Sequence, residues 1–193
     1  MTVFRDLCQH ILDIYENSAK AGADLVKVAI IEDFKKDQLS ITLEDNGRGM
    51  DAKMVQRISD PWVTTRTTRK VGLGIPFLRQ TAEMCGGHFE LMSAPGEGTR
   101  THATFQHSHI DRPPLGDLVA TLTCMIVGYP HVDLVYHHRV ILETADDTAG
   151  EREYTLDTRE IREVLGEDVP LSDPAVLRFL RTELEEGLRS LQG

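Results

Sequence analysis

The sequence predicts an α+β fold, because segments with a helical period and segments with a strand period are both present. Residues 4–20 place apolar side chains at spacings of three and four, which is typical of an amphipathic helix. Residues 25–32 and 38–44 alternate apolar and polar side chains around a short polar stretch, which is typical of a hairpin. Two further strand-like runs, 88–94 and 99–109, flank the turn sequence Pro-Gly-Glu-Gly. Strands that follow one another through short turns pair antiparallel.

The elements of the first 112 residues have recognisable ends. Gly22 is a candidate C-cap for the first helix, and Gly86-Gly87 ends a later helix that begins at Gly74. Asp51 is a candidate N-cap for a short helix through residue 60. Residues 61–71 are polar, basic and without a period, and we interpret them as a loop.

Pro113-Pro114 marks a candidate boundary, which predicts two units, residues 1–112 and 113–193. In the second unit we expect an apolar segment at 115–127, strands at 132–138 and 139–145, and two helices. Asp173 and Pro174 begin the last helix, whose apolar stripe consists of Val176, Leu177, Leu180, Leu184, Leu188 and Leu191. This stripe is expected to pack on the strands at 132–145 or to form the seam of a homodimer.

Composition and charge exclude several classes of protein. The net charge of −10 and the pI of about 5.2 argue against non-specific binding to nucleic acid or to an anionic membrane. The longest apolar run, residues 118–129, is too short to span a bilayer, and no signal peptide is visible. Three widely spaced cysteines fit neither a disulfide framework nor a zinc site, so a cytoplasmic location is expected.

The stretch TLEDNGRGM, residues 42–50, places an acid just before two glycines. Asn46-Gly47 alone is ordinary turn chemistry, but a turn requires neither Asp45 nor Gly49. Gly72 and Gly74 open a helix, where backbone amides can face an anion. There is no P-loop pattern.

Four segments in a fixed order resemble the GHKL superfamily of ATPases, which includes gyrase, ninety-kilodalton heat-shock chaperones, histidine kinases and MutL. HILDIYENSAKAGA resembles the N-box, DNGRGM the G1 box, VGLGI the G2 box and GEGT the kinase-type G3 box, over roughly residues 5–107. DPWVTTR is similar to the segment that kinases place ahead of the lid. The resemblance implies a two-layer Bergerat-type α/β sandwich: a mixed, mostly antiparallel sheet covered by helices on one face. The pattern of residues 113–193 adds a small α/β C-terminal extension.

The resemblance also implies ATP and Mg²⁺ as cofactors. Asp45 would accept a hydrogen bond from the adenine amine, Gly47 and Gly49 would keep side chains away from the base, and Asn17 would be the Mg²⁺ ligand. The other implied nucleotide contacts are Met50, Thr65, Arg66, Lys70, Val71, Gly72, Leu73, Gly74 and Thr99.

The chain departs from the family pattern at two places. Asp13 stands where hydrolysing members carry a glutamate general base, and Glu16 is either a substitute or a solvated neighbour. Lys70 stands where the G2 pattern usually has a glycine. Trp62, at the usual aromatic lid position, is expected to pack rather than to stack on the base.

Three activities compete. The first is a stand-alone ATP-binding regulator that controls an unidentified protein partner through nucleotide-dependent lid closure, with slow hydrolysis or phosphoryl transfer. The second is a protein kinase that acts on a partner histidine or serine, as anti-sigma-factor kinases do. The third is a fragment of a gyrase-like or MutL-like ATPase, which the length disfavours. The histidines His107, His109, His137 and His138 have no spacing that requires a metal.

Overall fold

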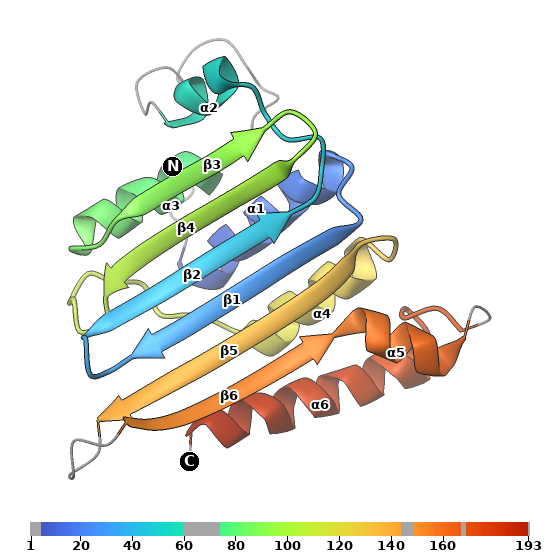
Figure 1. Cartoon of the computed structure of the whole chain (residues 1–193). Helices are drawn as coiled ribbons and strands as arrows, with labels where there is room; N and C mark the ends of the chain where they lie inside the picture. Colours follow the sequence, from blue (N-terminus) through green and yellow to red (C-terminus); the bar gives the residue numbers. More distant parts are fainter. Residues whose placement is uncertain (1–4, 60–73, 144–148, 167–168, 193) are drawn as a thin grey trace.

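The computed structural model describes residues 5–59, 74–143, 149–166 and 169–192. Its centre is a six-stranded sheet with the strand order β3-β4-β2-β1-β5-β6 (Figure 1). The strands are β1 (Leu25–Asp33), β2 (Gln38–Asp45), β3 (Phe89–Ala94), β4 (Gly98–Gln106), β5 (Asp133–Glu143) and β6 (Ala149–Asp157). All neighbouring strands pair antiparallel except β1 and β5, which are parallel. The predicted mixed, mostly antiparallel α+β fold is confirmed.

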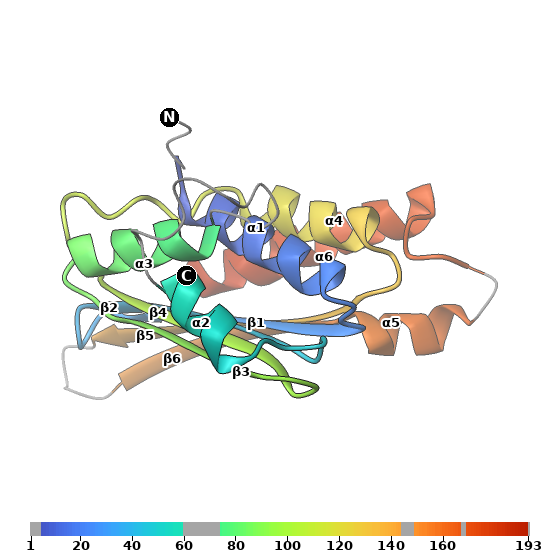
Figure 2. The ribbon, with the colours of Figure 1, turned by 90° about the horizontal axis from the view of Figure 1, so that it is seen from above.

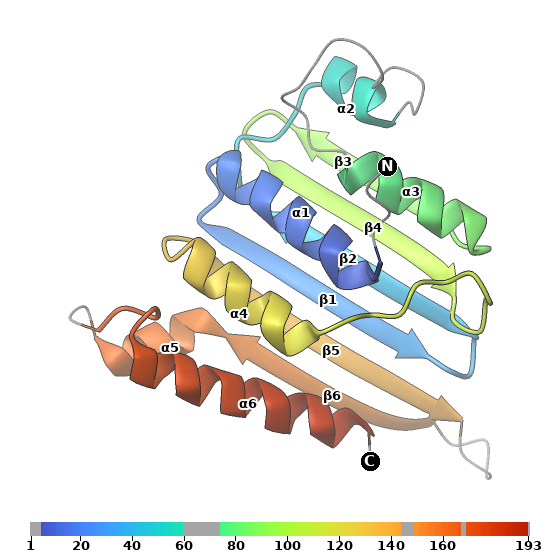
Figure 3. The ribbon, with the colours of Figure 1, turned by 180° about the vertical axis from the view of Figure 1, so that it is seen from behind.

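Helices form a second layer on one face of the sheet (Figures 2 and 3). The covering helices are α1 (Leu7–Lys20), α3 (Gly74–Met84), α4 (Leu118–Gly128) and α6 (Pro174–Gln192). The short helix α2 (Ala52–Ser59) lies at the β3 edge, and α5 (Thr158–Leu165) follows β6 directly. Asp6 accepts from the backbone N–H of Gln9 and Asp51 from that of Met54, so carboxylates cap α1 and α2.

The core lies between the two layers because the strands alternate as their sequences predict. Val26, Val28 and Ile30 of β1 are buried, and Leu39, Ile41 and Leu43 of β2 are buried beside them. Full burial of each such side chain contributes roughly 1.5–3 kcal/mol relative to exposure.

The sheet and the core continue past residue 112. Strand β5 pairs with β1 from Leu25–Asp133 to Asp33–Ile141, in the middle of the sheet. The backbone N–H of Leu7 donates to the Pro114 carbonyl at 2.9 Å, which joins the start of α1 to the segment before α4. The division at residue 112 stays a prediction, and a fragment experiment is described in the Discussion.

The strands predicted at 132–138 and 139–145 are one continuous strand, β5, so that prediction is wrong at the His137-His138 pair. His138 is buried and bonds to Glu32, so it continues the strand instead of ending it. Strand β6 was not predicted, because its alternation of Arg152, Tyr154 and Leu156 with glutamates and Thr155 is largely polar.

The apolar stripe of α6 is buried within the chain. Its buried members are Val176, Leu180, Leu184 and Leu191, and α6 packs mainly on β6 and α4. Strand β6 therefore provides much of the packing surface for α6 that the sequence analysis expected from residues 132–145.

Candidate functional site

The end of β2 presents one carboxylate whose two oxygens are both held. The Ser18 hydroxyl, buried on α1, donates to Asp45 Oδ2 at 2.7 Å, and the Gly47 N–H donates to Asp45 Oδ1 at 2.9 Å. Each oxygen keeps further acceptor capacity, because an ionised carboxylate offers about four lone-pair sites. Asp45 is therefore a pre-oriented acceptor for a donor group in the neighbouring cavity.

The backbone around Asp45 requires glycine at Gly49. Gly49 has φ +64, and a Cβ there would lie 1.9 Å from the carbonyl oxygen of Ala94. A side chain would therefore clash with the β3–β4 turn. The next residue, Met50, donates its N–H to Ser93 Oγ at 2.9 Å, so the turn after β2 is fastened to β3.

A cavity of about 180 Å³ lies beside Asp45, between α1, the turn after β2, α2 and the start of α3. Of the predicted site residues, it brings together Asn17, Asp45, Gly49, Met50 and Thr99. The other lining residues are Ile14, Ser18, Lys20, Ala21, Arg48, Met54, Ile58, Ile75 and Thr101.

Asp13 and Asn17 lie one turn apart on α1 and contact each other. Asn17 Nδ2 donates to Asp13 Oδ2 at 3.1 Å, and the Gly74 N–H donates to the same oxygen at 3.1 Å. Because a carboxylate only accepts, the Asn17 amide must turn its NH₂ group toward Asp13 and keep its oxygen for another partner. An amide oxygen is a donor type that Mg²⁺ accepts, so Asn17 fits the predicted metal ligand.

Glu16 lies away from this group. Its carboxylate pairs with Lys20 at 2.9 Å on the exposed side of α1, and this hydrogen bond raises the pKa of Lys20. This pair does not decide between a substitute base and a solvated neighbour, so the catalytic role of Glu16 stays a prediction.

Several predicted site residues lie outside the described residues. These are Thr65, Arg66, Lys70, Val71, Gly72 and Leu73, together with Trp62 of the same stretch. Gly74 is the first described residue after this stretch and begins α3.

Sequence reasoning missed three residues that the structure places at the site. Ser18 holds Asp45, and Ile75 lines the cavity. His10 is buried on the same helix as Ser18, and burial lowers its pKa to about 4. A polar residue on the apolar face of α1 was the available signal for Ser18 and His10.

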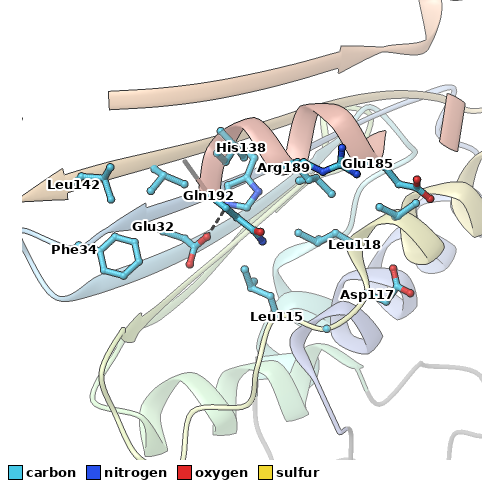
Figure 4. A pocket seen from close by; sticks show the side chains of 15 residues that line it. Glu32, Phe34, Leu115, Asp117, Leu118, His138, Leu142, Glu185, Arg189 and Gln192 are labelled. Atoms are coloured by element: carbon cyan, nitrogen blue, oxygen red, sulfur yellow. Dashed lines mark hydrogen bonds and ion pairs between the residues drawn. The ribbon is translucent and has the colours of Figure 1, made fainter. Parts of the chain in front are cut away.

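A larger cavity, about 720 Å³, lies at the other end of β1 and involves the C-terminal part of the chain. Figure 4 shows Glu32 and His138 facing each other there, with Leu115, Leu118 and Leu142 around them. Glu32 accepts from both His138 and His107 at 3.0 Å. This cavity shares no lining residue with the one at Asp45.

Within the described ranges, no three histidine, cysteine, aspartate or glutamate side chains gather closely enough to hold a metal ion. None of the helices in those ranges has both the length and the apolarity to cross a membrane.

Comparison with known proteins agrees with the sequence resemblance. The family model described as histidine kinase-, DNA gyrase B-, and HSP90-like ATPase matches residues 2–109. The chain is 28% identical over 126 residues to the "Non-motile and phage-resistance protein" of Caulobacter vibrioides, covering 61% of this chain and 15% of that protein. It is 30% identical over 93 residues to the "Sensor histidine kinase ZraS" of Klebsiella oxytoca, covering 48% of this chain and 20% of that kinase. The chain thus spans a fifth or less of the length of these two relatives.

A solved structure shares the fold. The crystal structure of the N-terminal domain of a DNA repair protein superposes with a TM-score of 0.51 at 14% identity, covering 86% of this chain and 58% of that one. The matched family segment contains Asp13, Asn17, Asp45 and Gly74, and it is more than half of the chain. The predicted GHKL membership is confirmed: the chain belongs to the histidine kinase-, DNA gyrase B- and HSP90-like ATPase family.

Proposed function

We propose that this chain binds Mg-ATP in the cavity beside Asp45 and acts as a nucleotide-dependent regulator of a protein partner. The observation that carries the proposal is the Asp45 carboxylate, which Ser18 and Gly47 hold from both sides at the cavity. An acceptor fixed in this way suits the exocyclic amine of adenine. Guanine presents a carbonyl oxygen at that position, so the Asp45 carboxylate would face another acceptor and receive no hydrogen bond.

The neighbouring residues fit the rest of the cofactor. Asn17 would hold Mg²⁺ through its amide oxygen, and the N-terminus of α3 would lie at the phosphates. Bound Mg-ATP would supply the phosphoryl group. Asp13 would accept a proton from an attacking water if hydrolysis occurs. Closure of the segment 60–73 over the nucleotide stays a sequence prediction, because that segment lies outside the described residues.

The binding test compares ATP with GTP by calorimetry in the presence of Mg²⁺. The parent should prefer ATP clearly, and Asp45→Asn should lose roughly 1.5–3 kcal/mol of binding free energy, about ten- to a hundredfold in affinity. Asp51→Asn is the matched control, because it changes an exposed helix cap for an equally good one. Equal affinity for GTP, or an unaffected Asp45→Asn variant, contradicts the assignment.

The second candidate is phosphoryl transfer to a histidine or serine of a partner, and the similarity to a sensor histidine kinase favours it. Incubation with γ-labelled ATP separates the two, because hydrolysis yields free labelled phosphate and transfer yields labelled protein. Asp13→Asn keeps an oxygen for Gly74 and Asn17 and removes the base. It should therefore lower phosphate release more than it weakens binding. Association of two copies of this chain into a homodimer is a proposal as well.

A further inference from the structure

We propose that the cavity of about 720 Å³ at Glu32 is a second binding site, which takes a small organic cation with an aliphatic body, such as an alkylammonium ion. This cavity, which we call the Glu32 cavity, lies between the end of β1, β5, the start of α4 and the C-terminal part of α6 (Figure 4). It shares no lining residue with the cavity beside Asp45, so the proposal does not rest on the proposed function.

The size and the walls of the Glu32 cavity suit a small organic molecule. Pockets for such ligands measure roughly 300–1,000 Å³ and combine mostly apolar walls with a few fixed polar groups. Here both layers of the fold contribute apolar side chains: Val140 and Leu142 of β5, Leu115 ahead of α4, Leu118 of α4 and Leu188 of α6. An aliphatic ligand body in the cavity would therefore contact the sheet and two of the helices that cover it.

The carboxylate of Glu32 is held in one orientation at this cavity. His138 Nε2 lies 3.0 Å from Glu32 Oε1, and His107 Nε2 lies 3.0 Å from Glu32 Oε2. Because an ionised carboxylate only accepts hydrogen bonds, Nε2 carries the proton in both rings. In the neutral ring of His138, Nδ1 then accepts from the Tyr136 hydroxyl at 2.8 Å. Burial raises the pKa of Tyr136 well above its ordinary value of 10, so the hydroxyl keeps its proton for this bond.

Glu32 is a negative charge that lacks a full counter-charge. Burial opposes its ionisation, but the hydrogen bonds from His138 and His107 outweigh burial and lower the pKa below the ordinary value of 4.5, so Glu32 is ionised at pH 7. Only 18% of its side chain is exposed, and no lysine or arginine in the described part of the chain pairs with it. Each oxygen keeps acceptor capacity beyond its bond to an imidazole. An ammonium group in the cavity would supply both a donor and the missing positive charge.

The other charged groups around the cavity favour a ligand of the same sign. Asp117 and Glu185 line the cavity together with Glu32, and Arg189 is the one lysine or arginine among its described lining residues. Glu185 and Arg189 lie four residues apart on α6, a spacing at which opposite charges attract each other. Three carboxylates with one guanidinium leave the lining negative, so a cation is favoured over an anion of the same shape.

The test uses n-hexylammonium as the probe in NMR titrations of the full chain at pH 7. A dissociation constant of about 1 mM is expected for a ligand of this size. Hexanoate has a similar length and the opposite charge, and hexan-1-ol has no charge, so each should bind at least about tenfold more weakly. Absence of hexylammonium binding overturns the proposal. Equal binding of the three probes overturns it as well, because the cavity would then be an apolar gap without a preference for charge.

Variants at the cavity decide whether Glu32 is the group that binds the cation. Glu32→Gln keeps the shape and removes the charge, so it should weaken hexylammonium binding about tenfold and leave hexan-1-ol binding unchanged. Glu90→Gln is the matched control, because Glu90 is a half-exposed carboxylate of the same sheet outside the cavity, and it should change neither affinity. A folded Glu32→Gln variant with the parent's affinity for hexylammonium overturns the proposal.

A second variant keeps the proposal testable if Glu32→Gln does not fold. Leu188→Trp places a larger side chain in the cavity from α6, so it should weaken the binding of hexylammonium and of hexan-1-ol alike. Unchanged hexylammonium binding by this variant places the probe elsewhere on the molecule and overturns the proposal.

Discussion

At the scale of single residues, Asn17 has an orientation that its neighbour determines. Its amide nitrogen donates to Asp13, so its oxygen is available for a cation. We expect Asn17→Ala to remove the Mg²⁺ dependence of ATP binding while the adenine contact at Asp45 remains. Calorimetry with and without Mg²⁺ should show a large difference for the parent and almost none for the variant.

A carboxylate that does not line the cavity provides the control for this experiment. Glu83 pairs with Arg79 on the exposed side of α3, so Glu83→Gln should keep the full Mg²⁺ effect. The assignment of Asn17 as metal ligand fails if Asn17→Ala responds to Mg²⁺ as the parent does.

At the scale of elements, Glu32 ties β1 to β5 and to the residue that follows β4. Burial alone would raise the pKa of Glu32, but hydrogen bonds from His138 and His107 outweigh burial and lower it from the ordinary value of 4.5. A carboxyl whose pKa is lower in the folded state stabilises the fold fully above its unfolded pKa, and this stabilisation is lost as pH falls through the folded value.

The Glu32→Gln variant tests this pH dependence. Its free energy of unfolding should lie below the parent's at pH 7, and the difference should shrink as pH falls below about 4.5. Urea titrations from pH 7 to pH 3 measure it. Glu90→Gln, on an exposed strand position, serves as the comparison and should show a small difference at every pH. A Glu32→Gln difference that stays constant with pH would show that the carboxylate's charge is not what matters.

The hydrogen bonds of Glu32 with His107 and His138 illustrate why the sequence predicts some elements and not others. The hairpin of β1 and β2 follows from alternation, because its partners are close in the chain. His137-His138 looks like a break, but His138 is buried because Glu32, 106 residues away, accepts its hydrogen bond. The parallel pairing of β5 with β1 could not be predicted either, because the periodicity of a strand does not show which distant strand it pairs with.

Some features of the candidate site could likewise be predicted from the sequence, and others could not. Asp45, Gly49 and Asn17 could be found from motif order, because each lies in a short segment with a characteristic pattern. The hydrogen bond of Ser18 to Asp45 could not, because it depends on the approach of β2 to α1, which are distant in sequence.

At the scale of the whole molecule, the pairing of β5 with β1 predicts that residues 113–193 stabilise the part of the chain that contains the cavity beside Asp45. Without them, β1 becomes an edge strand, and the core residues Leu7, Ile30 and Tyr15 lose neighbours from α4 and β5. We therefore expect a fragment of residues 1–112 to unfold at lower temperature than the full chain and to associate through the β1 edge.

Thermal unfolding and light scattering of the two proteins measure this effect. All residues that line the cavity beside Asp45 lie within residues 1–112, so any fragment that remains folded should still prefer ATP to GTP. A monomeric fragment with the stability of the full chain would instead support a division into two units at residue 112.

The parallel pairing of β1 with β5 also has a consequence for synthesis on the ribosome. Leu25 pairs with Asp133, so β1 lacks this neighbouring strand until 108 further residues (133 − 25) have been synthesised. At about 5–20 residues per second, translation leaves that edge open for roughly 5–20 s. During this time the nascent chain exposes an apolar strand edge to whatever else is in the cell, and a chaperone that shields it would protect newly made copies more than finished ones.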